Sequence, residues 1–215
     1  MYKLSYSSIS NFLQCPRKFK EVNVDYRFKD SSFFAQKGTD IHKTIEDYIK
    51  GVSAVYPLGN YEHPVIEQLR KSYHVKKPSG YVIGVEQQFA INSSYAPCDY
   101  KDPDAILRGK IDLYVLTPAV LKVIDWKSGK RRDNRLQATT YSVLTNHLLP
   151  NGKQEFVFDY LQNGKDPAIT VTEKDKENLV KLIETIQTAE EFPERPGPLC
   201  KWCPVPKAFC PVKQE

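Results

Sequence analysis

Two stretches in the middle of the chain decide the fold: GKIDLYV at residues 109–115 and VIDWK at residues 123–127. In each, a single carboxylate, Asp112 or Asp125, interrupts a run of β-branched, aromatic and other apolar residues that is typical of a buried strand. Thr117-Pro118 lies between them and favours a tight connection. We therefore expect two adjacent antiparallel strands that bring both carboxylates to the same part of a sheet.

Helix and strand patterns continue outward from these two stretches. Apolar residues three and four apart predict helices, and short runs of β-branched and aromatic residues predict strands. We expect helices at 7–20, 39–50, 65–73, 134–149 and 172–191, with Ser7 and Thr172 as caps, and strands at 81–91, 105–116, 120–126, 155–161 and 168–171. This order predicts an α/β fold in which a mixed central sheet is flanked by helices.

Composition narrows the class of protein. A chain of 215 residues that is 40% hydrophobic is long enough for one core, so a single domain over residues 1–215 is expected. Its net charge of +5 suits a polyanionic partner without proving one. There is no run of about 18 apolar residues and no apolar segment behind Met1. The sequence thus predicts a cytoplasmic protein without a membrane partner.

The two acids suit metal-dependent chemistry. Mg²⁺ and Mn²⁺ prefer oxygen ligands, and phosphodiester hydrolysis by such ions needs converging carboxylates. Lys127 lies two residues after Asp125, so both side chains are expected on one face of the strand, where the ammonium can stabilise charge on a phosphate. An Asp-x-Lys pattern alone is weak evidence, because a second copy occurs at 99–101 in a polar stretch. A strand-end Asp beside a solvated Lys is the plainer alternative.

The order of the motifs adds more than any single motif. An early helical His, Gly-x-Ile-Asp, Asp-x-Lys and a following Gln-x-x-x-Tyr resemble, over most of the chain, the RecB-like nucleases of the PD-(D/E)XK type. The resemblance implies a restriction-endonuclease-like fold that hydrolyses DNA. It implies that metal is held by His42, Asp112 and Asp125, that Lys127 is catalytic, and that DNA near the scissile phosphate is contacted by Gln137 and Tyr141.

Two further groups join this expected site. Glu86 lies in the strand expected at 81–91, where related nucleases also carry an acid, and it is a candidate to support the metal or Lys127. The basic loop after Asp125 leads into the helix of Gln137, so a grip on the DNA backbone is predicted for Lys130, Arg131, Arg132 and Arg135. For each loop residue, a solvated surface turn is the alternative.

Four of the five cysteines are arranged like metal ligands. Cys200, Cys203 and Cys210 lie in a proline-rich tail, and Cys15 lies at the end of the first expected helix. Four thiolates suit either zinc or an iron-sulfur cluster, and their spacing does not separate the two. Cys98 is left as an ordinary free thiol.

One distant N-terminal cysteine followed by three grouped cysteines resembles the iron-sulfur branch of RecB-like nucleases, which includes the AddB nuclease domain, the CRISPR-associated RecB-like exonucleases and related phage exonucleases. The resemblance implies a 4Fe-4S cluster. It joins the N-terminal helix to the C-terminal tail, so that residues 1–30 and 192–215 bind the cluster and residues 31–191 form the nuclease core.

The resemblance as a whole implies a metal-dependent DNA exonuclease. Its partner is DNA, single-stranded or with free ends, and its pathway is recombination, repair, phage DNA processing or CRISPR adaptation, with the protein partners of those pathways. A structure-dependent or restriction-like endonuclease is one alternative. A non-catalytic DNA-end-binding protein with a structural metal cluster is another, which the intact carboxylates disfavour because a binder gains little from acids facing phosphate. The sequence does not predict the polarity of digestion or the oligomeric state.

Overall fold

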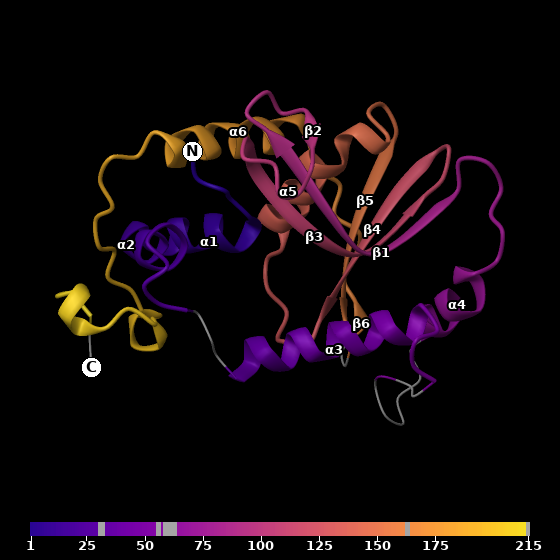
Figure 1. Cartoon of the computed structure of the whole chain (residues 1–215), viewed down its shortest axis with the longest axis horizontal. Coiled ribbons are helices and arrows are strands. Elements are labelled where there is room, and N and C mark those ends of the chain that lie inside the picture. The colour runs from indigo at the N-terminus through magenta and orange to yellow at the C-terminus, as the bar shows by residue number, and fades with distance from the viewer. Residues whose placement is uncertain (30–32, 55–56, 58–63, 162–163, 214–215) are drawn as a thin grey trace.

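A mixed sheet forms the centre of the molecule (Figure 1) in the computed structural model, which describes residues 1–29, 33–54, 57, 64–161 and 164–213. The strand order is β2-β1-β3-β4-β5-β6, where β4 and β5 are parallel and the other neighbours are antiparallel. The strands are β1 (Val82–Asn92), β2 (Pro97–Cys98), β3 (Ala105–Leu116), β4 (Val120–Lys127), β5 (Lys153–Tyr160) and β6 (Gly164–Lys165). The predicted α/β fold with a mixed sheet is confirmed.

Helices cover both faces of this sheet (Figure 1). They are α1 (Tyr6–Gln14), α2 (Pro16–Phe19), α3 (Phe33–Ile49), α4 (Pro64–Tyr73), α5 (Arg135–Thr145) and α6 (Glu173–Gln187), with a π-helical turn at Lys20–Val24 and 3₁₀ turns at Asn146–Leu148, Cys200–Trp202 and Lys207–Phe209. Thr172 caps α6 as predicted. Among the described residues, no helix combines the length and apolarity that a membrane crossing requires.

Several predicted boundaries were wrong. Ser5, not Ser7, caps α1, because Ser5 accepts a hydrogen bond from the Ser8 backbone while the Ser8 hydroxyl accepts one from the Ser5 backbone. The first helix also ends at Cys15, where the backbone becomes extended ahead of a proline. The helix expected from residue 39 begins at 33, and the one expected to reach 191 ends at 187. The strand expected at 168–171 is only an isolated bridge to β5.

Three hydrophobic clusters hold the layers together. The first lies between the sheet and the pair α3 and α4, and includes Ile45, Ile49, Ile66, Leu113 and Trp126. The second joins the N-terminal segment to α6 and the start of β3, and includes Leu4, Ile9, Phe19, Leu107 and Ile183. The third lies under α5 and includes Ile111, Tyr141, Phe156 and Phe158. The site described below lies where the first and third clusters meet.

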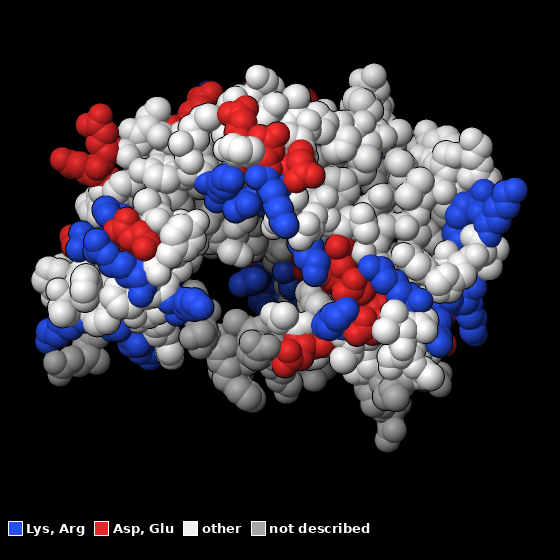
Figure 2. All heavy atoms as spheres, viewed as in Figure 1, with Lys and Arg blue, Asp and Glu red and all other residues white. Residues whose placement is uncertain are grey.

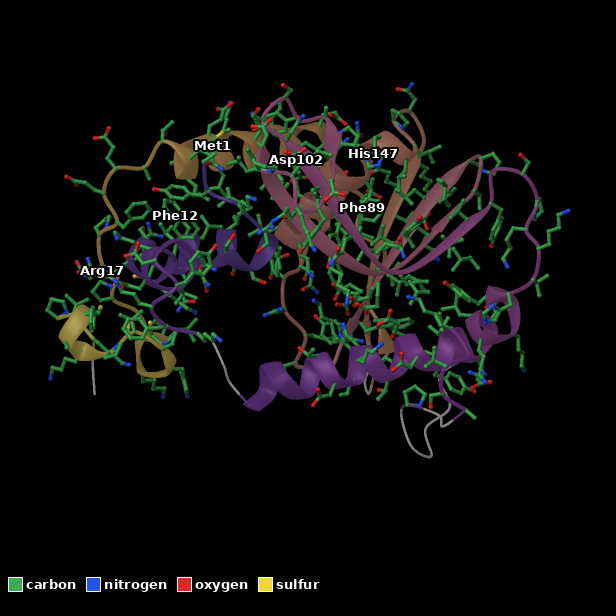
Figure 3. All side chains as sticks on the ribbon, viewed as in Figure 1. Met1, Phe12, Arg17, Phe89, Asp102 and His147 are labelled. Atoms are coloured by element: carbon green, nitrogen blue, oxygen red, sulfur yellow. The ribbon has the colours of Figure 1, made fainter. Side chains whose placement is uncertain are left out.

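The tail, defined here as residues 188–213, runs from α6 back to α1 and α2 (Figure 1). Arg17 of α2, labelled in Figure 3, donates a hydrogen bond to the Phe209 carbonyl at 3.0 Å. The rings of Phe28 and Phe209 pack edge to face with centroids 5.2 Å apart. At the C-terminal end of α6, where the tail begins, Gln187 exchanges two hydrogen bonds with the backbone of Tyr2. The N-terminal helices and the tail therefore form one packed region.

Candidate active site

The site begins where β3 and β4 separate. Their pairing ends at Leu113 and Ile124, and beyond that point Oδ2 of Asp112 accepts a hydrogen bond from the Trp126 backbone N–H at 2.8 Å. Ile111 and Leu113 are two residues apart but belong to different hydrophobic clusters, so the regular alternation of β3 is interrupted at Asp112. The interruption opens the sheet between its two central strands and gives the carboxylate a backbone donor there.

Glu86 lies opposite this interruption on β1. It stands between the pairs Val85–Leu113 and Gln87–Ile111, and its φ of +55° is in the left-handed region. A non-glycine residue in that region costs about 1–3 kcal/mol, and such strain concentrates at functional sites. The Glu86 side chain is 5% exposed, with Oε1 4.0 Å from His42 Nδ1, and Oε2 forms an ion pair with Lys110.

His42 on α3 completes a group of three candidate metal ligands. A ring nitrogen of His42, a carboxylate oxygen of Glu86 and a carboxylate oxygen of Asp112 all lie within 4.8 Å of one another. Nδ1 of His42 is 3.2 Å from Asp112 Oδ1, and Nε2 is 2.9 Å from the Trp126 carbonyl. If Nε2–H donates to that carbonyl, Nδ1 faces the two carboxylates, which is the orientation a metal-binding histidine needs.

The charges in this group shift one another's protonation. Burial lowers the pKa of His42, but the hydrogen bond and charge of Asp112, with the charges of Asp125 and Glu86, raise it to about 9. Burial and the charge of Asp125 raise the pKa of Asp112 to about 6, against the opposing effect of His42. Without a metal ion, the group therefore holds an extra proton that a cation must displace.

Asp125 is held beside this group by three side chains from β4 and α5. Its Oδ1 accepts hydrogen bonds from Gln137 Nε2 at 2.7 Å and from the Tyr141 hydroxyl at 2.6 Å. Its Oδ2 lies 2.6 Å from Lys127 Nζ, which also donates to Gln137 Oε1 at 2.8 Å. Asp125 and Lys127 thus share one face of β4 as predicted. Burial and the charges of Asp125 and Asp112 raise the pKa of Tyr141, so its hydroxyl stays a donor.

The chemistry of these donors fits a hard divalent cation. An imidazole nitrogen and carboxylate oxygens suit Mn²⁺ and Mg²⁺. Asp125 adds Oδ2, which is buried and accepts no hydrogen bond of normal geometry although it contacts the Lys127 ammonium. A buried carboxylate oxygen that accepts no hydrogen bond is free to act as a ligand to a bound cation.

Comparison of the chain with known proteins identifies a family. The model of the PD-(D/E)XK nuclease superfamily matches residues 3–211. The chain belongs to this superfamily. Two solved structures are similar to this PD-(D/E)XK protein, each with a TM-score of 0.47. The first is the crystal structure of SSO0001, which is 14% identical and covers 100% of this chain and 89% of its own. The second is the crystal structure of a "putative exonuclease" from Eubacterium rectale, which is 15% identical and covers 90% of this chain and 84% of its own. No curated protein matches.

The basic loop of this PD-(D/E)XK protein is exposed, and its four cations differ in their partners. Arg131 pairs with Asp166 at 3.2 Å, and Arg135 pairs with Asp175 at 3.1 Å. Lys130 and Arg132 form no ion pair in the described part of the chain, so their charges are available to a phosphate. Figure 2 shows Lys and Arg side chains around a hollow between the N-terminal helices and the sheet.

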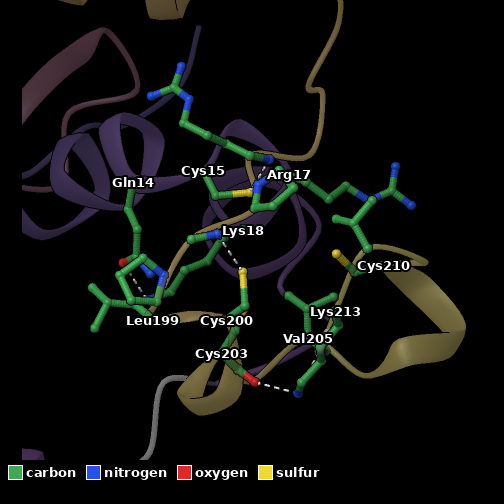
Figure 4. A pocket seen from close by; sticks show the side chains of 15 residues that line it. Gln14, Cys15, Arg17, Lys18, Leu199, Cys200, Cys203, Val205, Cys210 and Lys213 are labelled. Carbon is green, nitrogen blue, oxygen red and sulfur yellow. Dashed lines mark hydrogen bonds between the residues drawn. The ribbon is translucent and has the colours of Figure 1, made fainter. Parts of the chain in front are cut away.

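The four predicted cysteine ligands line one cavity of about 260 Å³ between α1 and the tail (Figure 4). Backbone N–H groups donate to two of the sulfurs, from Arg195 to Cys15 at 3.4 Å and from Gly197 to Cys200 at 3.3 Å. Among the described cysteines, no three sulfur atoms lie within 4.8 Å of one another, so no compact ligand group is formed. Burial, and the neighbouring Cys15, raise the pKa of Cys210. Cys98 is a free thiol on β2.

Several features of this PD-(D/E)XK site were not predicted. Sequence patterns gave Glu86 a supporting role, whereas it is one of the three grouped candidate ligands and Asp125 lies outside that group. The part played by the Trp126 backbone and the pairing of Lys110 with Glu86 have no signal in the sequence. Gln137 and Tyr141 are 6% and 5% exposed and contact Asp125, so their predicted contact with DNA stays a prediction.

Proposed function

We propose that this PD-(D/E)XK protein is a metal-dependent DNA exonuclease of the RecB-like type. The observation that carries the proposal is the meeting of His42, Glu86 and Asp112 within 4.8 Å, next to an Asp125–Lys127 pair at 2.6 Å. Three buried carboxylates are costly to bring together unless a cation binds them. That cost argues against a protein that only binds DNA ends.

Each side chain has a role in phosphodiester hydrolysis under this proposal. His42, Glu86, Asp112 and Asp125 would hold the divalent ion, which would supply a positive charge to polarise the phosphate and neutralise the charge that builds on it. Lys127 forms an ion pair with Asp125 and donates one hydrogen bond to Gln137, and its ammonium has three N–H donors, so a donor is left to orient the attacking water or the phosphate. Gln137 and Tyr141 hold Asp125 and Lys127 in position. Lys130 and Arg132 grip the flanking backbone.

The order of the motifs and the position of the cysteines favour an exonuclease over an endonuclease, because both follow the RecB-like pattern. DNA ends in recombination, repair, phage DNA processing or CRISPR adaptation are the corresponding substrates. The digestion of a linear substrate next to its circular form tests this choice. An exonuclease degrades only the linear form, whereas an endonuclease also cuts the circle.

We infer that Cys15, Cys200, Cys203 and Cys210 hold a 4Fe-4S cluster. The cavity they line is larger than one zinc ion needs, because a tetrahedral zinc site with Zn–S bonds of about 2.3 Å keeps its sulfurs roughly 4 Å apart. Cationic side chains of Arg17, Lys18, Arg195 and Lys213 also line it, which suits a cluster with four thiolates. The N–H donors to Cys15 and Cys200 stabilise thiolate sulfur. Residues 1–30 and 192–215 then form the cluster-binding part of one domain.

The nuclease proposal is tested with end-labelled DNA and Mn²⁺. We expect Asp112→Ala, Asp125→Ala and Lys127→Ala to reduce the rate by a factor of about 10² or more, with the fold retained by circular dichroism. Lys122→Ala on β4 is the matched control, because among the described residues its side chain pairs with Glu155, at 4.0 Å, and with no residue of the site. Parental rates in the Asp112 or Asp125 variant would refute the site.

The cluster proposal is tested by anaerobic purification, an absorption spectrum, and analysis of iron, sulfide and zinc. We expect a brown protein with four irons, and loss of colour and of thermal stability in Cys203→Ser. Cys98→Ser is the control, since Cys98 lies on β2 and outside the cavity. A colourless parent protein with one zinc would refute the iron-sulfur assignment.

A further inference from the structure

A second cavity, larger than the cysteine cavity, lies between α4 and the segment that leads into β1. Its volume is about 1040 Å³, at the upper end of the range for small-molecule sites, and it is open to solvent. We call it the α4–β1 groove. Its lining includes Gln68, Lys71, Lys76, Lys77, Tyr81 and Ile83. An open groove of this size suits part of a polymer better than an enclosed small ligand.

The sequence of α4 explains one wall of the groove. Ile66 and Leu69 are buried in the cluster beneath the sheet. Gln68 and Lys71 lie three residues apart on the opposite side of α4 and line the groove, and Val75 lines it just beyond the end of the helix. The helix therefore presents a polar and basic stripe to solvent while its apolar stripe anchors it to the core.

The other wall is formed as the chain returns toward the sheet. Gly80, with φ +78°, turns the chain, and Tyr81 and Ile83 then form the part of the wall that enters β1. The Tyr81 residue is half-buried and lines the groove, so it offers an aromatic surface beside the lysines. Aromatic rings in basic grooves are stacking platforms for unpaired bases.

The charges in the groove favour an anion. Lys77 is engaged with backbone carbonyls at the end of α4, including that of Val75 at 2.5 Å, and Glu67 accepts a hydrogen bond from Tyr48 at 2.7 Å. By contrast, Lys71 and Lys76 are exposed and form no ion pair among the described residues. Figure 2 shows Lys and Arg side chains gathered at this end of the molecule, around α4.

We propose that the α4–β1 groove binds a single-stranded flank of the DNA that is cut at the acidic site. Lys71 and Lys76 contact its phosphates, and Tyr81 stacks on a base. The inference rests on the proposed nuclease function for the identity of the strand. β1 connects the two places, since Ile83 in the groove is three residues before Glu86, a distance of about 10 Å along an extended strand. A stretched single strand covers that distance with a few nucleotides.

The test is a comparison of the parent protein with a Lys71→Ala/Lys76→Ala double variant. Binding of a labelled 20-nucleotide single strand is measured by fluorescence anisotropy in EDTA, so that no cleavage is needed. Each lost phosphate contact lowers the slope of log affinity against log salt by about 0.7, so affinity at 0.1 M salt is expected to fall roughly tenfold to thirtyfold and the slope by about 1.4. Tyr81→Ala weakens binding at least about fivefold, and Tyr81→Phe restores it.

A Lys174→Ala/Lys181→Ala double variant on α6 is the charge-matched control, because both side chains are exposed and lie away from the groove. Equal losses in the two double variants, or parental binding in the groove variant, would overturn the proposal, as would a loss seen only with a blunt duplex. The outcome is separate from the nuclease proposal. If the parent does not cut DNA but the groove variant alone loses binding, the groove stands and the nuclease function falls.

Discussion

The proton held by His42 makes the stability of the metal-free protein depend on pH in a defined direction. The pKa of His42 is about 9 in the folded protein, against 6.5 for an ordinary histidine. The folded state therefore binds this proton more tightly than the unfolded chain does. Its contribution to stability is fully present below about pH 6.5 and is lost as the pH rises through 9. The difference of about 2.5 pH units corresponds to about 3 kcal/mol.

This free energy is large enough to measure by thermal unfolding. For a domain of this size, about 3 kcal/mol corresponds to a fall in Tm of roughly 6–12 °C between pH 6.5 and pH 9. We expect this fall in EDTA for the parent protein beyond any fall seen in His42→Gln, which keeps a polar side chain but holds no extra proton. Taking the difference between the two proteins removes the other groups that titrate in the same range.

Divalent metal should reverse the dependence. A cation held by His42 would compete with this proton, so binding of Mn²⁺ is expected to become tighter as the pH rises, and the gain in Tm on adding Mn²⁺ is expected to be larger at pH 9 than at pH 6.5. If the Tm curves of the parent and His42→Gln run parallel in EDTA across this range, the reasoning from the His42–Asp112 contact is refuted.

Three other changes test separate parts of the site. Lys110→Met removes the ammonium that competes with a metal ion for Glu86. Titration calorimetry should therefore give a Kd for Mn²⁺ about fivefold lower than that of the parent protein, and a higher Kd would contradict this. Tyr141→Phe removes one hydrogen bond to Asp125 and should lower kcat roughly tenfold with KM for DNA unchanged, whereas a rise in KM alone would favour direct contact with DNA. Gly84→Ala places a Cβ about 2.0 Å from the Tyr114 ring and should cost about 1–3 kcal/mol in urea unfolding, while Gly129→Ala, with open space around it, should change stability by less than about 0.5 kcal/mol.

The strands that carry the acids could be predicted because runs of apolar residues indicate that both strands are buried. The range 105–116 agrees with β3 in full, and β4 extends only one residue past the expected end. Both are central strands with neighbours on each side, and residues 111–114 and 123–126 are buried runs in which Asp112 and Asp125 are the only charged residues. The same contrast made the antiparallel pairing of the two strands that carry the acids predictable.

The finer arrangement of the site could not be predicted because it depends on contacts between distant segments. The left-handed conformation of Glu86 is set by its position opposite the opened part of β3, and glutamate has no local preference for it. Gln137 has helical spacing with Tyr141, which predicts a shared face but not that the face points inward to Asp125. The weak edge pairing of β6 depends on two residues, too few for a pattern.

The main chain of Trp126, rather than its side chain, contacts the candidate ligands. Its N–H is bound to Asp112 and its carbonyl to His42, while its indole is buried in the core at 1% exposure. Both polar contacts come from main-chain atoms, so every replacement except proline keeps them. A saturation scan of codon 126 would therefore rank amino acids by volume and shape, with proline standing apart as the one replacement that removes the donor to Asp112.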